Sequence, residues 1–436
     1  MLAQRSGRAP VLAALLVWAG LLVVAVVWGR HLQSAGEINV DAPPFRGAYR
    51  LALLSVVPAA CFAAVAVVVL PLAARLLPWR LLLPLSWVSA VLWAVLLAFL
   101  DGHDSLVGPI ARRGEYVPAV AEVGDDPVGW LTSFAERAAE RDHPLHVNGH
   151  PPLMVLVLWV WDRIGLSGAG WAGALVIGVG ASAVVAVAVT LRGLGDERSA
   201  RAALPFLVLG PFAVTVATSA DSFFLGVGAW AAAALTLGVR RGRPLLVLLG
   251  GLLAGSLPYL SYGLLPLGAV LVAALFLATR SPSDRATLRS PPVLVALVAG
   301  LLVVPAVLTL GGFWWPDGVV ATHEAWATGK GDDRPYVYSF LANFAILGVL
   351  VGPATAAGAV LRPRRAPAVL AAAALVGVVV LAVSGVTRLE TERIWLPFAP
   401  WMVAVCAALP RRDRRRWLAA NALCALTFQA LVLDIW

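Results

Sequence analysis

Runs of about 20 apolar residues recur from one end of this chain to the other, and they restrict its fold more than any other feature. A helix of that length crosses a bilayer core of about 30 Å. Charged residues make up 13% of the chain, about half their share in a typical soluble domain. Because backbone groups in lipid must be hydrogen-bonded within the chain, such runs predict membrane-spanning helices. We therefore expect an all-α, polytopic membrane protein.

The apolar runs can be counted along the chain. We predict about 13 spans from their positions and from the polar segments between them. The predicted spans cover residues 10–29, 51–73, 81–100, 170–191, 202–219, 222–239, 244–258, 263–279, 291–311, 337–360, 367–385, 394–409 and 417–434.

The distribution of charge predicts an orientation. If the N-terminus is inside, the short inner loops collect most of the 33 basic residues, and all six histidines fall outside. Cytoplasmic loops carry such an excess of Lys and Arg. We therefore predict a multi-pass protein of the cell membrane with a cytoplasmic N-terminus and an external C-terminus. The formal net charge of +9 reflects these topology signals, so we expect no nucleic-acid partner. The acidic residues expected inside are Asp196, Glu197, Asp284 and Asp413.

The apolar stretch 151–166 departs from this pattern. If it crossed the bilayer, the basic loop 192–201 and every later loop would change sides. We therefore predict an interfacial or half-inserted (re-entrant) helix that returns to the outer face. Pro151 and Pro152 suit its start, where the missing amide groups cost little.

The same outer loop contains an amphipathic helix candidate at residues 127–141, suited to lying in the membrane interface. Its apolar stripe consists of Trp130, Leu131, Phe134 and Ala138.

The polar loops divide the chain into three regions. Residues 1–80 supply additional N-terminal transmembrane helices, and residues 81–260 form the expected catalytic core with a large outer loop at 101–169. Residues 261–436 form the C-terminal helices, with a second outer loop at 312–336.

Three carboxylates in the first outer loop are candidate general bases. Asp101 and Asp104 directly follow the third predicted span, and Glu115 lies shortly after them. A carboxylate there can take the proton of an attacking hydroxyl group. The alternative is a solvated loop that ends a helix.

Three histidines, His143, His146 and His150, precede the non-crossing helix. They can hydrogen-bond a phosphate or sugar, coordinate a metal, or pack the loop. Their spacing, interrupted by prolines, is not that of a helical metal-binding pair. We therefore predict substrate contacts and no metal.

Asp221 lies at the membrane end of a predicted span, where a carboxylate is functional or caps the helix. In the second outer loop, Lys330 and Arg334 are suited to hold a lipid-linked phosphate, with Tyr336 beside them. The alternative is a flexible charged connector.

Glu390, Glu392 and Arg393 lie at the edge of the twelfth predicted span. They form either an internal ion-pair network or the wall of a substrate cavity.

Several of these features together resemble the GT-C superfamily, over roughly residues 85–240. They are the acidic outer loop after an early span, the step from His150 to Leu153 (His-Pro-Pro-Leu) before a non-crossing helix, and a span pair that ends at Asp221. GT-C proteins are multi-span glycosyltransferases that use polyprenyl-phosphate sugars. Protein O-mannosyltransferases and the aminoarabinose transferases of lipid A are similar in this region.

The resemblance implies a catalytic carboxylate in the first large outer loop. Members commonly present an Asp, often in Asp-Glu, after their first span. Here the span is the third, so residues 1–80 look like an addition, and residues 101–104 lack the adjacent Glu. Asp101 and Glu115 therefore share the expected role of base, with Asp104 third.

We thus expect an inverting glycosyltransferase without a cofactor. It would transfer a sugar from a lipid-linked donor to a glycan, lipid or protein acceptor at the outer membrane face. The alternatives are a transporter or flippase of a lipid-linked precursor and a non-catalytic scaffold of an envelope-synthesis complex. A transporter would need charges at mid-membrane.

Overall fold

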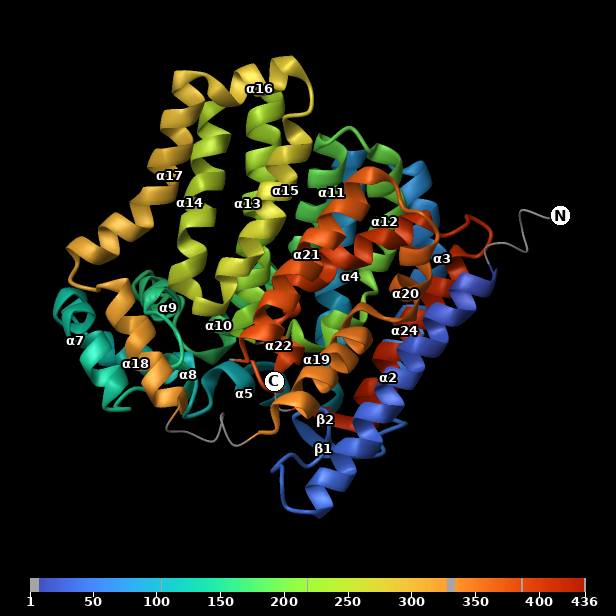
Figure 1. The fold of residues 1–436 in the computed structure, drawn as a ribbon, viewed down its shortest axis with the longest axis horizontal. Coiled ribbons are helices and arrows are strands. Elements are labelled where there is room, and N and C mark those ends of the chain that lie inside the picture. Colours follow the sequence, from blue (N-terminus) through green and yellow to red (C-terminus); the bar gives the residue numbers. More distant parts are fainter. Residues whose placement is uncertain (1–7, 103, 218, 328–333, 386, 435–436) are drawn as a thin grey trace.

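The structure is a computed structural model that describes residues 8–102, 104–217, 219–327, 334–385 and 387–434 (Figure 1). Most of these residues lie in helices, and the two strands have three residues each. The expectation of an all-α membrane protein is confirmed at this level.

Seven helices in the described part of the chain are long and apolar enough to cross a membrane. An eighth span results if α19 (Tyr336–Val351) and α20 (Pro353–Val360), which meet at an angle of 92°, are counted as one. The seven are α2 (Arg8–Ser34), α3 (Val57–Leu76), α4 (Trp79–Ala98), the pair α10 (Ala169–Ala181) and α11 (Ala183–Gly193), α13 (Ala220–Arg241), α17 (Pro291–Leu310) and α21 (Arg365–Ser384).

The predicted count of 13 spans is not confirmed, because several expected spans are short or broken helices. A helix of 11 to 17 residues falls short of a bilayer core, and prolines interrupt several of these stretches. The shorter segments are α12 (Glu197–Val208) with η2 (Pro211–Thr215), α14 (Pro244–Leu260), η3 (Tyr262–Leu267) with α15 (Gly268–Ala278), and the series α22 (Thr391–Ile394), η4 (Leu396–Phe398), α23 (Ala399–Val403) and η5 (Ala404–Ala408). The last expected span is α24 (Arg414–Leu431).

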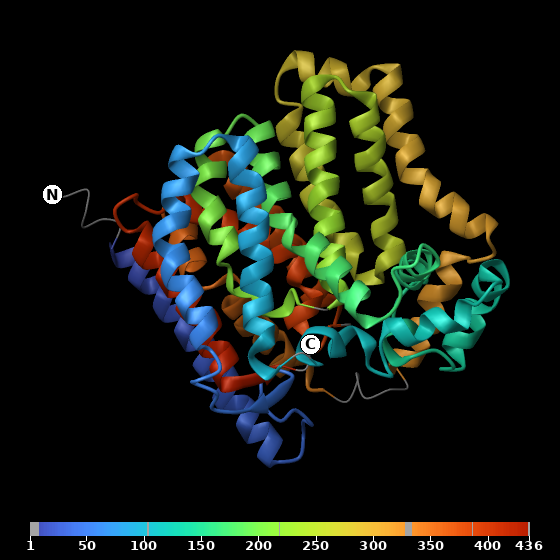
Figure 2. The ribbon, with the colours of Figure 1, turned by 180° about the vertical axis from the view of Figure 1, so that it is seen from behind.

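The short polar helices gather at two opposite ends of the bundle (Figures 1 and 2). One end carries α16 (Pro282–Arg289) with its basic residues. The opposite end carries the two predicted outer loops, which makes it the end at which the candidate site residues gather. Its helices are α5 (Asp104–Ala111), α6 (Tyr116–Val123), α7 (Pro127–Ala139), α8 (Leu145–Asn148), α9 (Leu153–Arg163) and α18 (Trp315–Ala327). Which end faces the cell exterior stays a prediction.

Helix α7 confirms the amphipathic helix and its stripe, since Trp130, Leu131, Phe134 and Ala138 are its buried residues. These residues are buried by other parts of the protein and not by the membrane interface that we expected. The ring of Phe134 lies 5.5 Å from that of Phe313, just before α18, so the stripe packs against protein. The periodicity located the apolar face, but it did not identify what covers that face.

Helix α9 has 11 residues, about 16 Å of helix, which is too short to cross a bilayer. It begins after Pro152, where the two prolines were expected. Its length is consistent with the predicted non-crossing segment, whereas its position relative to the lipid stays a prediction.

The N-terminal region shares one core with the rest of the chain. The indole N–H of Trp18 in α2 donates a hydrogen bond to the carbonyl of Gly348 in α19. The loop after α2 forms strand β1 (Gly47–Tyr49), which pairs antiparallel with β2 (Val432–Asp434) at the other end of the chain. This ribbon fixes Arg46, directly before β1, at the loop-rich end of the bundle.

Candidate functional site

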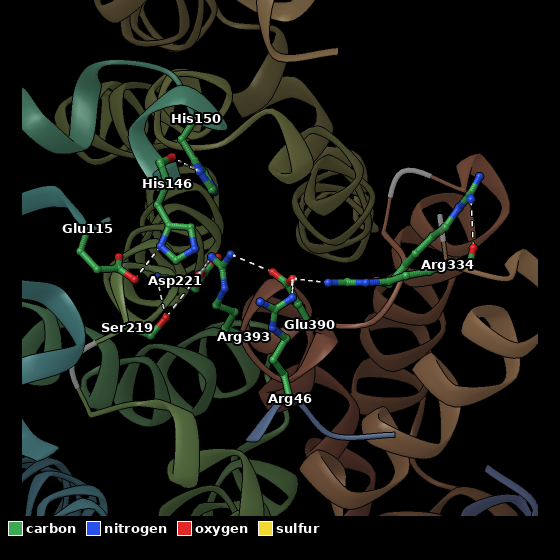
Figure 3. A network of polar contacts seen from close by, with 10 residues as sticks. Arg46, Glu115, His146, His150, Ser219, Asp221, Arg334, Glu390 and Arg393 are labelled. Carbon is green, nitrogen blue, oxygen red and sulfur yellow. Dashed lines mark hydrogen bonds and ion pairs between the residues drawn. The ribbon is translucent and has the colours of Figure 1, made fainter. Parts of the chain in front are cut away.

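Charged side chains from six segments meet at the loop-rich end of the bundle (Figure 3). They form two adjacent groups of ion pairs, together called the network: Glu115 with His146, and Asp221, Arg393 and Glu390 with Arg46 and Arg334. A small pocket opens beside the first group. Its volume is about 10 Å³, the space of a single water molecule. The lining residues are Pro109, Glu115, Tyr116, His146, Ser219, Ala220, Asp221 and Arg393.

Glu115 and His146 form a carboxylate–imidazole pair, with His146 Nδ1 2.5 Å from Glu115 Oε1. Glu115 directly precedes α6, and His146 lies in α8. The backbone N–H of His146 also donates to the carbonyl of Gly114, so the two loops are joined next to the pair. Both side chains retain 15% exposure. A carboxylate that orients an imidazole in this way is a common arrangement for moving a proton.

Asp221 and Arg393 form a buried ion pair, with Asp221 Oδ2 3.1 Å from Arg393 Nη1. The N-cap of α13 is Ser219, whose hydroxyl accepts a hydrogen bond from the backbone N–H of Asp221. The carboxylate of Asp221 is therefore not the cap, and it turns toward α22 instead. Burial of two charges is tolerated where they pair with each other.

Glu390 receives three guanidinium groups. Its Oε1 lies 2.5 Å from Arg46 Nη1 and 3.1 Å from Arg334 Nη2, and its Oε2 lies 3.4 Å from Arg393 Nη2. Burial raises the pKa of this carboxyl group, but the positive charges of Arg393, Arg46 and Arg334 outweigh it and lower the pKa to about 2. Glu390 is therefore ionised throughout the physiological range.

The backbone that presents Glu390 is strained. Leu389 and Glu390 have φ angles of 66° and 63°, in the left-handed region that costs an L-residue roughly 1–2 kcal/mol. Buried Asn343 of α19 holds this turn from behind: its Oδ1 accepts from the N–H of Leu389, and its Nδ2 donates to the carbonyl of Thr387. The surrounding structure thus compensates the strain at the residue that organises the three arginines.

Glu392 lies in the short helix α22, two residues after Glu390. Its Oε1 accepts a 2.8 Å hydrogen bond from the backbone N–H of Arg46. Burial raises its pKa to about 7. Glu392 therefore anchors the Arg46 loop through this hydrogen bond.

His150 lies beside this network. Its Nδ1 donates to the carbonyl of His146 at 2.7 Å, and its ring meets Tyr116 edge-on. Burial, together with the charge of Arg393, lowers its pKa to about 4. The imidazole is therefore neutral at physiological pH, with Nε2 left as the acceptor nitrogen.

Two other candidate residues lie in surroundings of their own. The fully buried His143 side chain contacts Glu122 Oε2 at 2.7 Å and stacks on Phe134, so the structure places it in the packing of the loop. Tyr336, at the start of α19, donates to the carbonyl of Val383 and is 41% exposed.

Three candidate residues remain: the carboxylates Asp101 and Asp104 and the cation Lys330. Asp104 begins α5 and is exposed. Asp101 ends a short 3-10 helix (Phe99–Asp101), but its side chain lies outside the described residues, as does all of Lys330. Their expected roles stay predictions.

The structure also adds residues that sequence reasoning missed. Arg46 lies in the region regarded as an addition, and it meets Glu390 across 344 positions of sequence. Ser219 and Asn343 look like ordinary helix residues in the sequence. Ser219 contacts Asp221 two positions away as the N-cap of α13. Asn343 meets Leu389 46 positions away, and only the folded chain creates that contact.

Within the described residues, no group of three or more His, Cys, Asp or Glu side chains is placed to hold a metal ion. Comparisons with known protein families, with curated proteins and with solved structures find no match for this chain. The functional argument therefore depends on the site itself.

Proposed function

We propose that this protein is a GT-C-like membrane glycosyltransferase that transfers a sugar from a polyprenyl-phosphate donor to a cell-envelope acceptor at the outer face. The observation that carries the proposal is the Glu115–His146 pair beside a cluster of arginines, of which Arg393 is buried, at the loop-rich end of a helical membrane bundle. The transfer requires a proton acceptor and positive charge close together, and this network supplies both.

In the proposed reaction, the acceptor hydroxyl enters the small pocket next to Glu115 and His146. Its oxygen attacks the anomeric carbon as its proton passes to the Glu115–His146 pair. The bond from that carbon to the phosphate oxygen breaks, and its electron pair stays on the lipid phosphate. Arg393, 3.1 Å from Asp221 and part of the pocket wall, is positioned to stabilise the charge that develops there.

The pocket admits little more than a hydroxyl group in this conformation. The sugar ring and the lipid phosphate therefore need the side chains at the pocket mouth to move. Arg46, with 34% of its side chain exposed, and Glu390, with 21%, are the accessible members of the network.

The position of the charges favours an enzyme over a transporter or flippase. The network lies among the loop helices at one end of the bundle, and Asp221 is at the first turn of α13. An alternating-access carrier concentrates its charged groups near the middle of its spans. A non-catalytic scaffold would have no use for a buried base next to a cation.

The test is sugar transfer by purified protein supplied with a polyprenyl-phosphate sugar and envelope acceptor. Glu115→Gln should lower the transfer rate by roughly 10²–10⁴-fold, the usual contribution of a general base. The matched control is Glu122→Gln, which removes the same charge from the neighbouring carboxylate–histidine pair. A scaffold or carrier would show no transfer in any variant, and equal transfer by wild type and Glu115→Gln would exclude Glu115 as the base.

A further inference from the structure

Three arginines from separate parts of the chain point at one carboxylate (Figure 3). Arg46 precedes β1, Arg334 precedes α19, and Arg393 lies in α22. Their guanidinium nitrogens lie 2.5–3.4 Å from the oxygens of Glu390. An ordinary surface salt bridge joins one cation to one carboxylate. Three arginines on a single carboxylate therefore indicate a role beyond that of a surface salt bridge.

Three guanidinium groups share the single carboxylate of Glu390, and one of them, Arg393, also pairs with Asp221. A carboxylate offers two oxygens and one negative charge. The polyprenyl phosphate that is released when the sugar leaves is a phosphate monoester, with three oxygens and nearly two charges, and the planar fork of Arg matches it in two-point contacts. A phosphate would therefore satisfy these donors better than the Glu390 side chain does.

The side chain of Glu390 can leave without unfolding its loop. Asn343 holds the backbone of this turn through the N–H of Leu389 and the carbonyl of Thr387, independently of the carboxylate. The carboxylate is also partly exposed, with Arg46 on its open side. Access from the surface and a separately fixed backbone are what a displaceable group requires.

We propose that Arg46, Arg334 and Arg393 form a phosphate-binding site, and that the Glu390 carboxylate occupies it until the phosphate of the lipid substrate displaces it. This phosphate is a diester in the donor and a monoester, with nearly two charges, once the sugar has left. This inference rests on the proposed function for the source of the phosphate. It assigns Glu390 the role of an internal competitor, which keeps the arginines together and screened while the site is empty of substrate. Binding of the donor would then release Glu390 toward solvent.

The test is a titration of the purified full-length protein with polyprenyl monophosphate in detergent and, separately, with inorganic phosphate. Glu390→Gln removes the competing charge, so it should bind polyprenyl phosphate at least about tenfold more tightly than wild type. Glu122→Gln, which takes a carboxylate from Arg137 outside the network, should leave the affinity unchanged. Equal or weaker binding by Glu390→Gln, with its thermal unfolding intact, overturns the inference.

Arg334 provides a second measurement that does not depend on how well Glu390→Gln folds. Arg334→Ala should weaken binding of polyprenyl phosphate about tenfold, and Arg334→Lys should weaken it less, because Lys keeps the charge and loses the fork. Equal affinity of wild type and Arg334→Ala removes this arginine from the site and overturns the inference.

The two ligands and the transfer assay separate the remaining outcomes. Inorganic phosphate that binds as tightly as polyprenyl phosphate supports the anion site and contradicts the lipid donor as its source. Tighter lipid-phosphate binding by Glu390→Gln, in a wild-type protein that transfers no sugar, supports the site while the proposed function fails. If wild type transfers sugar but Glu390→Gln binds polyprenyl phosphate no more tightly than wild type, the proposed function is supported and the proposed phosphate site fails.

Discussion

Glu390 and Glu392 are separated by one residue and experience opposite electrostatic surroundings. The three guanidinium groups around Glu390 overcome the effect of burial and lower its pKa to about 2. Glu392 is buried against the backbone of Arg46, and desolvation raises its pKa to about 7. At the residue scale, neighbours in space decide the charge state of a side chain, because the pKa of one glutamate is lowered by guanidinium groups and the pKa of the other is raised by burial.

These shifts predict how stability depends on pH. The raised pKa of Glu392 means that its contribution is complete below about pH 4.5 and is lost as pH rises through about 7. Thermal unfolding of wild type in detergent should therefore show a midpoint that falls between pH 5 and 8. Glu392→Gln should flatten this slope, by an amount on the order of 3 kcal/mol at most.

Glu390→Gln is the control for that measurement. The lowered pKa of Glu390 gives a contribution that is present above about pH 4.5 and is lost as pH falls toward 2. Its removal should leave most of the slope between pH 5 and 8, because burial is the largest cause of the raised Glu392 pKa and the charge of Glu390 adds less to it. An identical slope in wild type and Glu392→Gln would contradict the assignment of a buried, titrating Glu392.

At the scale of elements, the ribbon of β1 and β2 connects the two ends of the chain next to the site. The N–H of Arg50 donates to the carbonyl of Leu431, and the ring of Phe45 packs edge-on against Phe428 of α24. Both contacts flank Arg46. The C-terminal segment therefore positions an arginine of the site without contributing a side chain to it.

Removal of residues 432–436 deletes β2 and should release the Arg46 loop. We expect weaker binding of polyprenyl phosphate by about fivefold to tenfold, the loss of one charged hydrogen bond, with the helical content by circular dichroism retained. Removal of residues 435–436 alone keeps β2 and serves as the control. If both truncations bind like wild type, the ribbon does not position Arg46.

At the scale of the whole molecule, the two ends of the bundle differ in character. The end with α16 is basic, whereas the opposite end holds the histidines and carboxylates of the candidate site. The site therefore lies at one end of the bundle, and which end faces the cell exterior stays a prediction from the charge distribution.

Cysteine labelling in intact cells tests this orientation. In a cysteine-free background, single cysteines at Asp125, whose side chain is 93% exposed, and at Ile164, after α9, should react with an impermeant maleimide. A cysteine at exposed Arg285 in α16 should react only after permeabilisation. Labelling at 125 only after permeabilisation would reverse the topology, and opposite behaviour of 125 and 164 would make α9 a crossing helix.

The sequence by itself determined the class of the molecule and much of its local structure. Long apolar runs require helices in lipid, and the period of α7 placed Trp130 and Phe134 on its buried face. Apolar composition did not distinguish a full span from a broken one, as the segments after Pro211 and Glu390 illustrate. Only the tertiary structure brought Arg46 to Glu390, 344 positions away, and paired His143 with Glu122 but His146 with Glu115. Such contacts depend on how the helices pack and leave no periodic trace in the chain.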